Sequence, residues 1–93
     1  MTEEDFKAIA ELMLNELRDS MADKAIKLYF DDALLECLTK KSFSQAYGAR
    51  NLRRLIQKEI EDNIASEMIS NYSKQVSTIN LSVDNDKIIV FGL

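Results

Sequence analysis

The stretch "YGARNLRRLIQKEIEDNIASEMI", residues 47–69, predicts the longest helix of this 93-residue chain and decides its fold. Its apolar residues recur at steps of three and four, which places them on one face of a helix. The pattern lasts for about five turns of 3.6 residues each. The residues that carry it are Leu52, Leu55, Ile56, Ile60, Ile64, Ala65, Met68 and Ile69.

The residues before this stretch predict a first helix and a short strand. Thr2 is suited to cap the helix, because its hydroxyl can accept a hydrogen bond from a free amide of the first turn. Glu3, Glu4 and Asp5 follow, where carboxylates complement the positive end of the helix dipole. The apolar face of this helix consists of Phe6, Ile9, Ala10, Met13, Leu17 and Met21. The strand is indicated by the alternation of Ile26, Leu28 and Phe30 with more polar neighbours.

Three further segments complete the predicted order of elements. Asp31 and Asp32 introduce a second helix, which carries three leucines and ends near Ser42. The segment "KSFSQAYG" is interpreted as a packed loop because it holds two aromatic residues. After the long helix, "STINLSVDNDKIIVF" alternates in polarity around "DND" and predicts a β-hairpin. The order helix, strand, helix, helix, strand, strand predicts an α+β domain, with three main helices packed on one face of a sheet of about three strands.

Composition limits the classes of function that this chain can have. Residues 1–93 are expected to form a single domain, and the net charge of −4 disfavours nucleic acid and membranes as partners. The chain has no histidine and a single cysteine, Cys37, so a Cys/His or Ser/His catalytic pair and a zinc cluster are excluded. No metal site is expected. Without a signal peptide or membrane-spanning run, a cytoplasmic location is favoured.

The start of the long helix carries charges of the unfavourable sign. Arg50, Arg53 and Arg54 lie at the positive end of the helix dipole, and Arg50 and Arg54 repel each other across one turn. For Arg53 and Arg54 the preferred interpretation is structural: they would pair with acids elsewhere in the fold, such as Asp31, Asp32 or Glu36, and extend their aliphatic stems over the core. For Arg50 the alternative is a bound anion, since arginine forks and free helix amides suit phosphate oxygens.

The same stretch resembles the sensor-2 region of the Clp-type AAA+ unfoldases, whose small C-terminal subdomain has a Gly-Ala-Arg motif followed by a Leu-Arg-Arg helix. The resemblance continues through "EEDFKAIAELMLNELRDSM", "KAIKLYFDDALLECLTKKSF" and "STINLSVDNDKIIV", and so covers nearly the whole chain in order. It is greatest to the subdomain that ends the second ATPase module. The sequence differs from the family pattern at Asn51, where proline is common, and at residues 42–44, where the family has Gly-Tyr-Asp.

The resemblance implies a role for three residues of the motif. Arg50 would be the sensor-2 arginine that contacts the terminal phosphates of ATP, and Gly48 and Ala49 would position it. The implied parent protein is a hexameric ATPase that unfolds proteins, in which this domain packs against the large AAA+ domain of its own chain and of a neighbouring subunit. ATP or ADP would be its cofactor, and a protease or co-chaperone a possible partner.

The isolated chain is not expected to hydrolyse ATP or to bind it tightly. It has two glycines, Gly48 and Gly92, and no G-x-x-x-x-G-K-[ST] loop or recognisable Walker-B acid. No catalytic residue is therefore assigned in this chain, and an excised domain of a larger ATPase is the leading interpretation. The alternative is a stand-alone protein-interaction module without ATPase activity. The size of the native gene product distinguishes the two.

Overall fold

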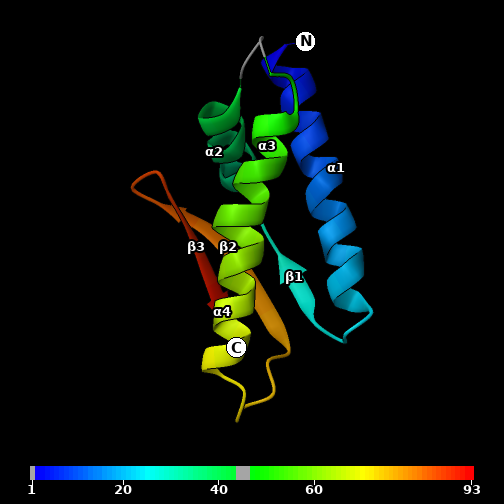
Figure 1. Cartoon of the computed structure of the whole chain (residues 1–93), viewed down its shortest axis with the longest axis vertical. Helices are drawn as coiled ribbons and strands as arrows, with labels where there is room; N and C mark the ends of the chain where they lie inside the picture. Colours follow the sequence, from blue (N-terminus) through cyan, green and yellow to red (C-terminus); the bar gives the residue numbers. More distant parts are fainter. Residues whose placement is uncertain (1, 44–46) are drawn as a thin grey trace.

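The computed structural model describes residues 2–43 and 47–93, and it confirms the predicted α+β fold and order of elements. Within these ranges no helix is long and apolar enough to cross a membrane. Figure 1 shows the helices on one side of a small sheet. The elements are α1 (Glu3–Ala22), β1 (Lys27–Tyr29), α2 (Asp32–Ser42), α3 (Arg50–Leu55), η1 (Ile56–Glu61), α4 (Asp62–Ser70), β2 (Thr78–Asp84) and β3 (Lys87–Gly92).

The sheet has the strand order β1-β2-β3, which the sequence alone left open. β1 pairs with β2 in parallel, so the chain between them crosses over through all of the remaining helices. β2 and β3 form the predicted antiparallel hairpin. Its turn places Asn85 at φ 50° and Asp86 at φ 62°, a left-handed pair that asparagine and aspartate tolerate.

The core lies between one face of the sheet and the helices. Leu28, Ile79, Leu81 and Ile88 point inward from the strands, at alternate positions as expected for a sheet covered on one side. Leu14 of α1 is fully buried, although the predicted apolar face omitted it. Phe43, at the start of the segment read as a packed loop, does pack: its ring meets that of Phe6 edge-to-face, with 5.4 Å between centroids. Residues 44–46 of that segment lie outside the described ranges.

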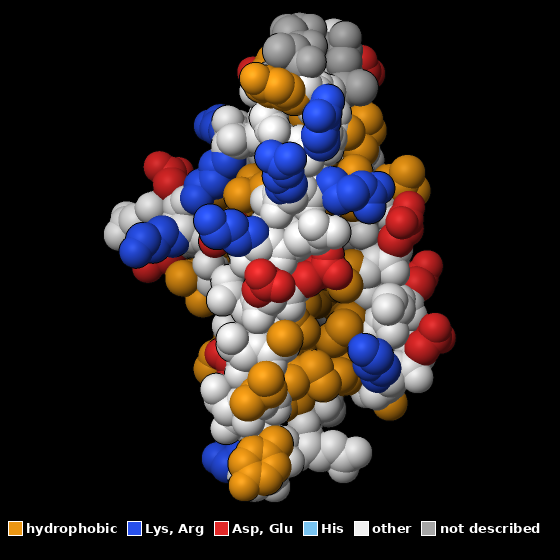
Figure 2. Space-filling view, in the orientation of Figure 1, with side chains coloured by type: hydrophobic (Ala, Val, Ile, Leu, Met, Phe, Trp, Pro, Cys, Tyr) orange, Lys and Arg blue, Asp and Glu red, His pale blue; other side chains and the backbone are white. Residues whose placement is uncertain are grey.

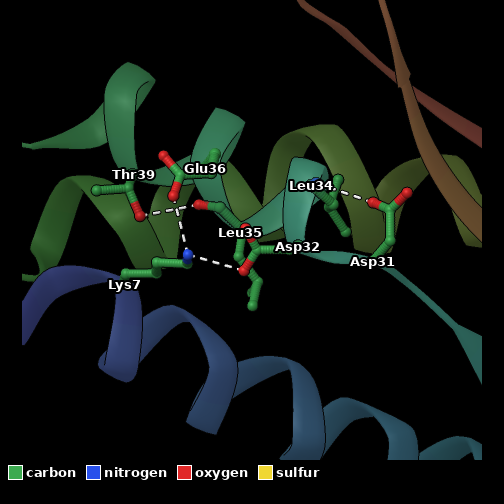
Figure 3. Close-up of polar contacts among 7 residues, drawn as sticks. All are labelled: Lys7, Asp31, Asp32, Leu34, Leu35, Glu36 and Thr39. Atoms are coloured by element: carbon green, nitrogen blue, oxygen red, sulfur yellow. Dashed lines mark hydrogen bonds and ion pairs between the residues drawn. The ribbon is translucent and has the colours of Figure 1, made fainter. Parts of the chain in front are cut away.

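Lys7 joins α1 to α2 on the surface (Figure 3). Its Nζ lies 2.7 Å from Asp32 Oδ1 and 2.8 Å from Glu36 Oε1. Hydrogen bonds to Asp32 and then Glu36 raise the pKa of Lys7 above its ordinary value. Asp31 is engaged differently, because its Oδ1 accepts a hydrogen bond of 3.0 Å from the amide of Leu34 and so caps α2. Asp31, Asp32 and Glu36 are therefore all engaged in hydrogen bonds or ion pairs.

α3, η1 and α4 form one continuous helix whose middle is a π-helix. At its end the amide of Asp62 donates to the carbonyl of Gln57, five residues earlier. The buried residues explain this departure, because they are spaced at four throughout, at Leu52, Ile56, Ile60 and Ile64. In an α-helix each such step overshoots a full turn by about 40°, so the face would drift away from the core. The wider π turn absorbs about one residue and realigns the two halves.

This realignment corrects the predicted apolar face at its C-terminal end. Ala65 is exposed, and Ile69 is 73% exposed. Uninterrupted helical periodicity predicts that both lie on the same apolar face as Ile60 and Ile64, and for these two positions the prediction is wrong. Met68, by contrast, is half-buried and packs against the core. The residues that face the core thus continue at a spacing of four, whereas Ala65 and Ile69 point outward.

Candidate functional site

The backbone just before α3 sets the position of Arg50. Gly48 has φ 55°, in the left-handed region that glycine adopts without strain, and Ala49 follows at φ −79° and ψ 0°. A Cβ added at Gly48 would meet no atom within 4 Å. Glycine is therefore required here by the positive φ of the turn and not by lack of space for a side chain.

Among the residues that the structure describes, no side chain caps the start of α3. Ala49 is the N-cap residue and has no side-chain acceptor, and the first turn holds no acid. Of the first amides, that of Arg50 donates to the carbonyl of Tyr47 at 3.3 Å. The regular helical hydrogen bonds begin with the amide of Arg53, which donates to the carbonyl of Ala49 at 3.1 Å. This end of the helix thus presents its positive dipole with three arginines and no compensating carboxylate.

The side chain of Arg50 is exposed at this end. Its Cζ lies 6.0 Å from the centroid of the Tyr47 ring, at the outer limit of a cation–π contact. An exposed guanidinium of this kind keeps its fork of donors available to a carboxylate or phosphate. Gly48 and Ala49 form the turn that leads into α3, and Arg50 follows it as the first residue of the helix and is exposed.

The expected ion pairs of Arg53 and Arg54 are not formed. In the two ranges that the structure describes, both ion pairs belong to Lys7, which holds Asp32 and Glu36, while Asp31 caps α2. The structural interpretation of Arg53 and Arg54 as partners of these acids was wrong for this reason. Arg53 lines a hollow of about 200 Å³ that has both apolar and polar walls: Met13, Leu17 and Ile56 on one hand and Glu16, Ser20 and Glu61 on the other. This link between α3 and α1 was not visible in the sequence.

Basic side chains gather around the start of the long helix (Figure 2). Arg50, Arg53, Arg54 and Lys58 are all exposed, and the acids of this helix begin only at Glu59. The chain is acidic overall, so the positive field is local. Such a group can bind an anion but supplies no nucleophile or general base. Across the described ranges no group of three or more acidic, cysteine or histidine side chains is suited to hold a metal ion.

Comparison with known proteins gives the chain a family. Residues 1–81 match the family model described as the C-terminal, D2-small domain of ClpB protein. The chaperone protein ClpB of Rhodopirellula baltica is 31% identical over 86 residues, which is 92% of this chain and 10% of that protein. The chloroplastic chaperone protein ClpC2 of Oryza sativa is 35% identical over 93 residues, covering 99% of this chain and 10% of its own length.

A third relative carries a nucleotide in its name. The chloroplastic ATP-dependent Clp protease ATP-binding subunit ClpA homolog CD4B of Solanum lycopersicum is 31% identical over 86 residues, 92% of this chain and 9% of that protein. The chain thus spans about a tenth of the length of the relatives it matches. Fold, motif and matches agree, and the chain belongs to the family of C-terminal D2-small domains of ClpB-type chaperones.

Proposed function

We propose that this domain senses the nucleotide of a Clp-type ATPase, and that Arg50 contacts the terminal phosphates of the bound ATP. The observation that carries the proposal is the exposed arginine at the uncapped start of a long helix. A positive charge there is unfavourable in the isolated domain and becomes favourable when a phosphate lies against it. The tomato relative, whose name describes an ATP-binding subunit, supports ATP as the nucleotide.

The proposed mechanism is a change in docking that depends on the nucleotide. While the terminal phosphate is present, Arg50 attracts the domain toward the ATP-binding part of the parent chain. Hydrolysis and phosphate release remove that attraction, so the preferred position of the domain shifts. In a hexameric parent this shift would reach the neighbouring subunit and help to thread protein substrates, with a protease or co-chaperone as partner. A cytoplasmic parent is part of the same proposal.

The test is the substitution Arg50→Ala in the full-length parent, with Arg54→Ala as the matched control. Both arginines are exposed on the same helix, but only Arg50 belongs to the Gly-Ala-Arg motif. A hydrogen bond to a charged group contributes about 1.5–3 kcal/mol, so ATP turnover or its coupling to unfolding should fall about tenfold to a hundredfold. Arg54→Ala should change it little. Equal activity of the Arg50→Ala parent and the wild type, in both assays, would refute the assigned role.

A further inference from the structure

The β3 edge of the sheet is open. Within the described part of the chain β3 pairs with β2 alone, so its other side is a free strand edge (Figure 1). The amide and the carbonyl of Leu93 both bond to Thr78, beside β2. Bonded and unbonded pairs alternate in an antiparallel ladder, so the register directs the backbone groups of Phe91 and Ile89 to β2 as well. The amides and carbonyls that face the free edge are those of Ile88, Val90 and Gly92.

This edge lacks the features that usually keep another strand away. Natural edge strands carry charges, prolines or bulges. Residues 88–92 hold no charged residue and no proline, and their register with β2 is unbroken. On the outer face of the sheet, Ile89 is 40% and Phe91 51% exposed. The β1 edge differs, because Arg18 Nε donates a hydrogen bond of 3.2 Å to the carbonyl of Leu28 and partly closes it. Of the two edges, that of β3 is the more accessible to a further strand.

A hollow of about 290 Å³, which we call the β3 groove, lies between β3 and α4. The strand contributes its central apolar residues, and the helix contributes a polar wall. The lining residues are Ile88, Ile89 and Val90 from the strand and Asn63, Ser66, Glu67 and Ser70 from the helix. The two serines are small and leave space beside the strand. A groove between an edge strand and a helix is suited to an extended peptide, which gains backbone hydrogen bonds by adding to the sheet.

Glu67 gives the β3 groove a negative charge. A Cβ added at Gly92 would lie 3.6 Å from Glu67 Oε2, so the carboxylate reaches the strand where the glycine has no side chain. The same oxygen accepts a hydrogen bond of 3.0 Å from Nδ2 of Asn71, which is neutral. Neither ion pair of the described residues includes Glu67. Because the whole chain also has a net charge of −4, the charge of the groove complements a basic segment.

We propose that the β3 groove binds an extended basic segment of another protein, which adds to β3 as an antiparallel fourth strand. Side chains of the added strand alternate between the two faces of the sheet. Those on the outer face meet Ile89 and Phe91 and are apolar. Those between them face α4 and include lysine or arginine, which meets Glu67. A second copy of β3 fits less well, because its residues on the helix side, Ile88 and Val90, carry no charge. The proposal is independent of the nucleotide-sensing role.

The probe is the labelled peptide Ser-Lys-Ile-Lys-Phe-Lys-Ser, titrated into the 93-residue chain and followed by fluorescence anisotropy. In antiparallel pairing its lysine amides face β3, and its isoleucine and phenylalanine amides face solvent. N-methylation of the lysine amides should therefore weaken binding about tenfold or more, because several hydrogen bonds are lost. N-methylation of the isoleucine and phenylalanine amides is the matched control and should change the affinity little. Bound peptide should also slow amide hydrogen exchange at Ile88, Val90 and Gly92.

Glu67→Gln tests the charge of the groove, with Glu61→Gln as its matched control. Both acids lie on the same long helix, but Glu61 does not line the β3 groove. Each change removes one negative charge, so non-specific attraction of the basic peptide falls equally. Glu67→Gln should weaken binding about twofold to fivefold more than the control does, as expected for a partly exposed ion pair. Glu67→Lys should in turn bind the acidic peptide Ser-Glu-Ile-Glu-Phe-Glu-Ser more tightly than the unchanged chain does.

Three results would overturn the proposal. The first is equal loss of affinity on methylation of either set of amides, because the peptide would then not be paired with β3. The second is equal affinity of the Glu67→Gln and Glu61→Gln variants for the basic peptide. The third is a dimer in sedimentation of the free chain, with exchange at Ile88, Val90 and Gly92 already slow, since a second copy would then occupy the edge.

Discussion

The two long helices of this domain, α1 and the helix formed by α3, η1 and α4, are of nearly equal length and begin in opposite ways. α1 is capped by Thr2, whose hydroxyl accepts the amide of Asp5 while the Asp5 carboxylate accepts the amide of Thr2, each at 3.1 Å. The second helix has Ala49 as its cap residue and arginines in its first turn. α1 satisfies its own start, whereas the start of the second helix has no side-chain cap from the described residues and no acid in its first turn.

The helices also differ in the spacing of the residues that they bury. Along α1 the core-facing positions Phe6, Ala10, Leu14, Leu17 and Met21 include one step of three among steps of four, and the helix is regular throughout. Along the second helix they keep a step of four, and a π segment forms in its middle. The spacing of four adds about one residue more than an α-helix can hold on one face. The wider π turn accommodates this residue, and the buried face is kept. Three predictions test this comparison.

The largest effect is expected from removing single residues. Deletion of exposed Lys58 should convert the π segment into α-helix, because the step from Ile56 to Ile60 is then shortened from four to three residues. The free energy of unfolding should be unchanged or higher. The matched deletion removes exposed Glu11 from α1. This helix has no π turn, so it has no additional residue that can be lost without rotating the buried face. The deletion turns Phe6 and Ala10 by about 100° relative to Leu14, and should cost roughly 2–4 kcal/mol.

Urea unfolding followed by circular dichroism measures both deletions, and amide hydrogen exchange over residues 56–62 reports loss of the π turn. Equal destabilisation by the two deletions would mean that the spacing of four does not cause the π segment.

A smaller effect is expected from exchanging the two helix starts. Thr2→Ala should lower the free energy of unfolding by about 1 kcal/mol, because it removes the cap of α1. Ala49→Asp should raise it by about 0.5–1 kcal/mol, since it adds the missing acceptor and a favourable charge. In the full-length parent the same Ala49→Asp change should weaken ATP binding, because its carboxylate competes with phosphate for Arg50. If Ala49→Asp stabilised the domain but left ATP binding by the parent unchanged, the result would contradict the proposed contact between Arg50 and the phosphates of ATP.

The smallest effect is a pH dependence confined to α1. Hydrogen bonds from Thr2, chiefly that of its backbone amide, hold the pKa of Asp5 below its ordinary value. The contribution of this carboxylate to stability is therefore present above the ordinary pKa of aspartate and is lost as pH falls through the lowered one. NMR titration of Asp5 measures the pKa, and amide exchange in the first turn of α1 measures fraying.

The start of the second helix has no acid in its first turn and should show no matching transition. Thr2→Ala is the control for the titration, because it should move the pKa of Asp5 back toward the ordinary value by removing the side-chain partner. Fraying of both helices over the same pH range would contradict the assignment to the capping box.

The sequence determined the elements and the motif of this protein. Periodicity and caps are local properties, and so α1, α2 and the β2–β3 hairpin could be predicted from neighbouring residues. The charge reversal at Arg50 and the need for a positive φ at Gly48 are local in the same sense. The family resemblance added the role implied for Arg50, which remains a prediction until Arg50→Ala is measured.

The tertiary structure decided which apolar and charged residues meet. The π segment arises because four buried positions must face one core, and the same requirement turns Ile69 outward. Lys7 takes the acids of α2 that seemed available to Arg53 and Arg54, because α1 packs beside α2. The parallel pairing of β1 with β2 joins residues about fifty positions apart. Such contacts depend on three-dimensional proximity, so no pattern of neighbouring residues records them.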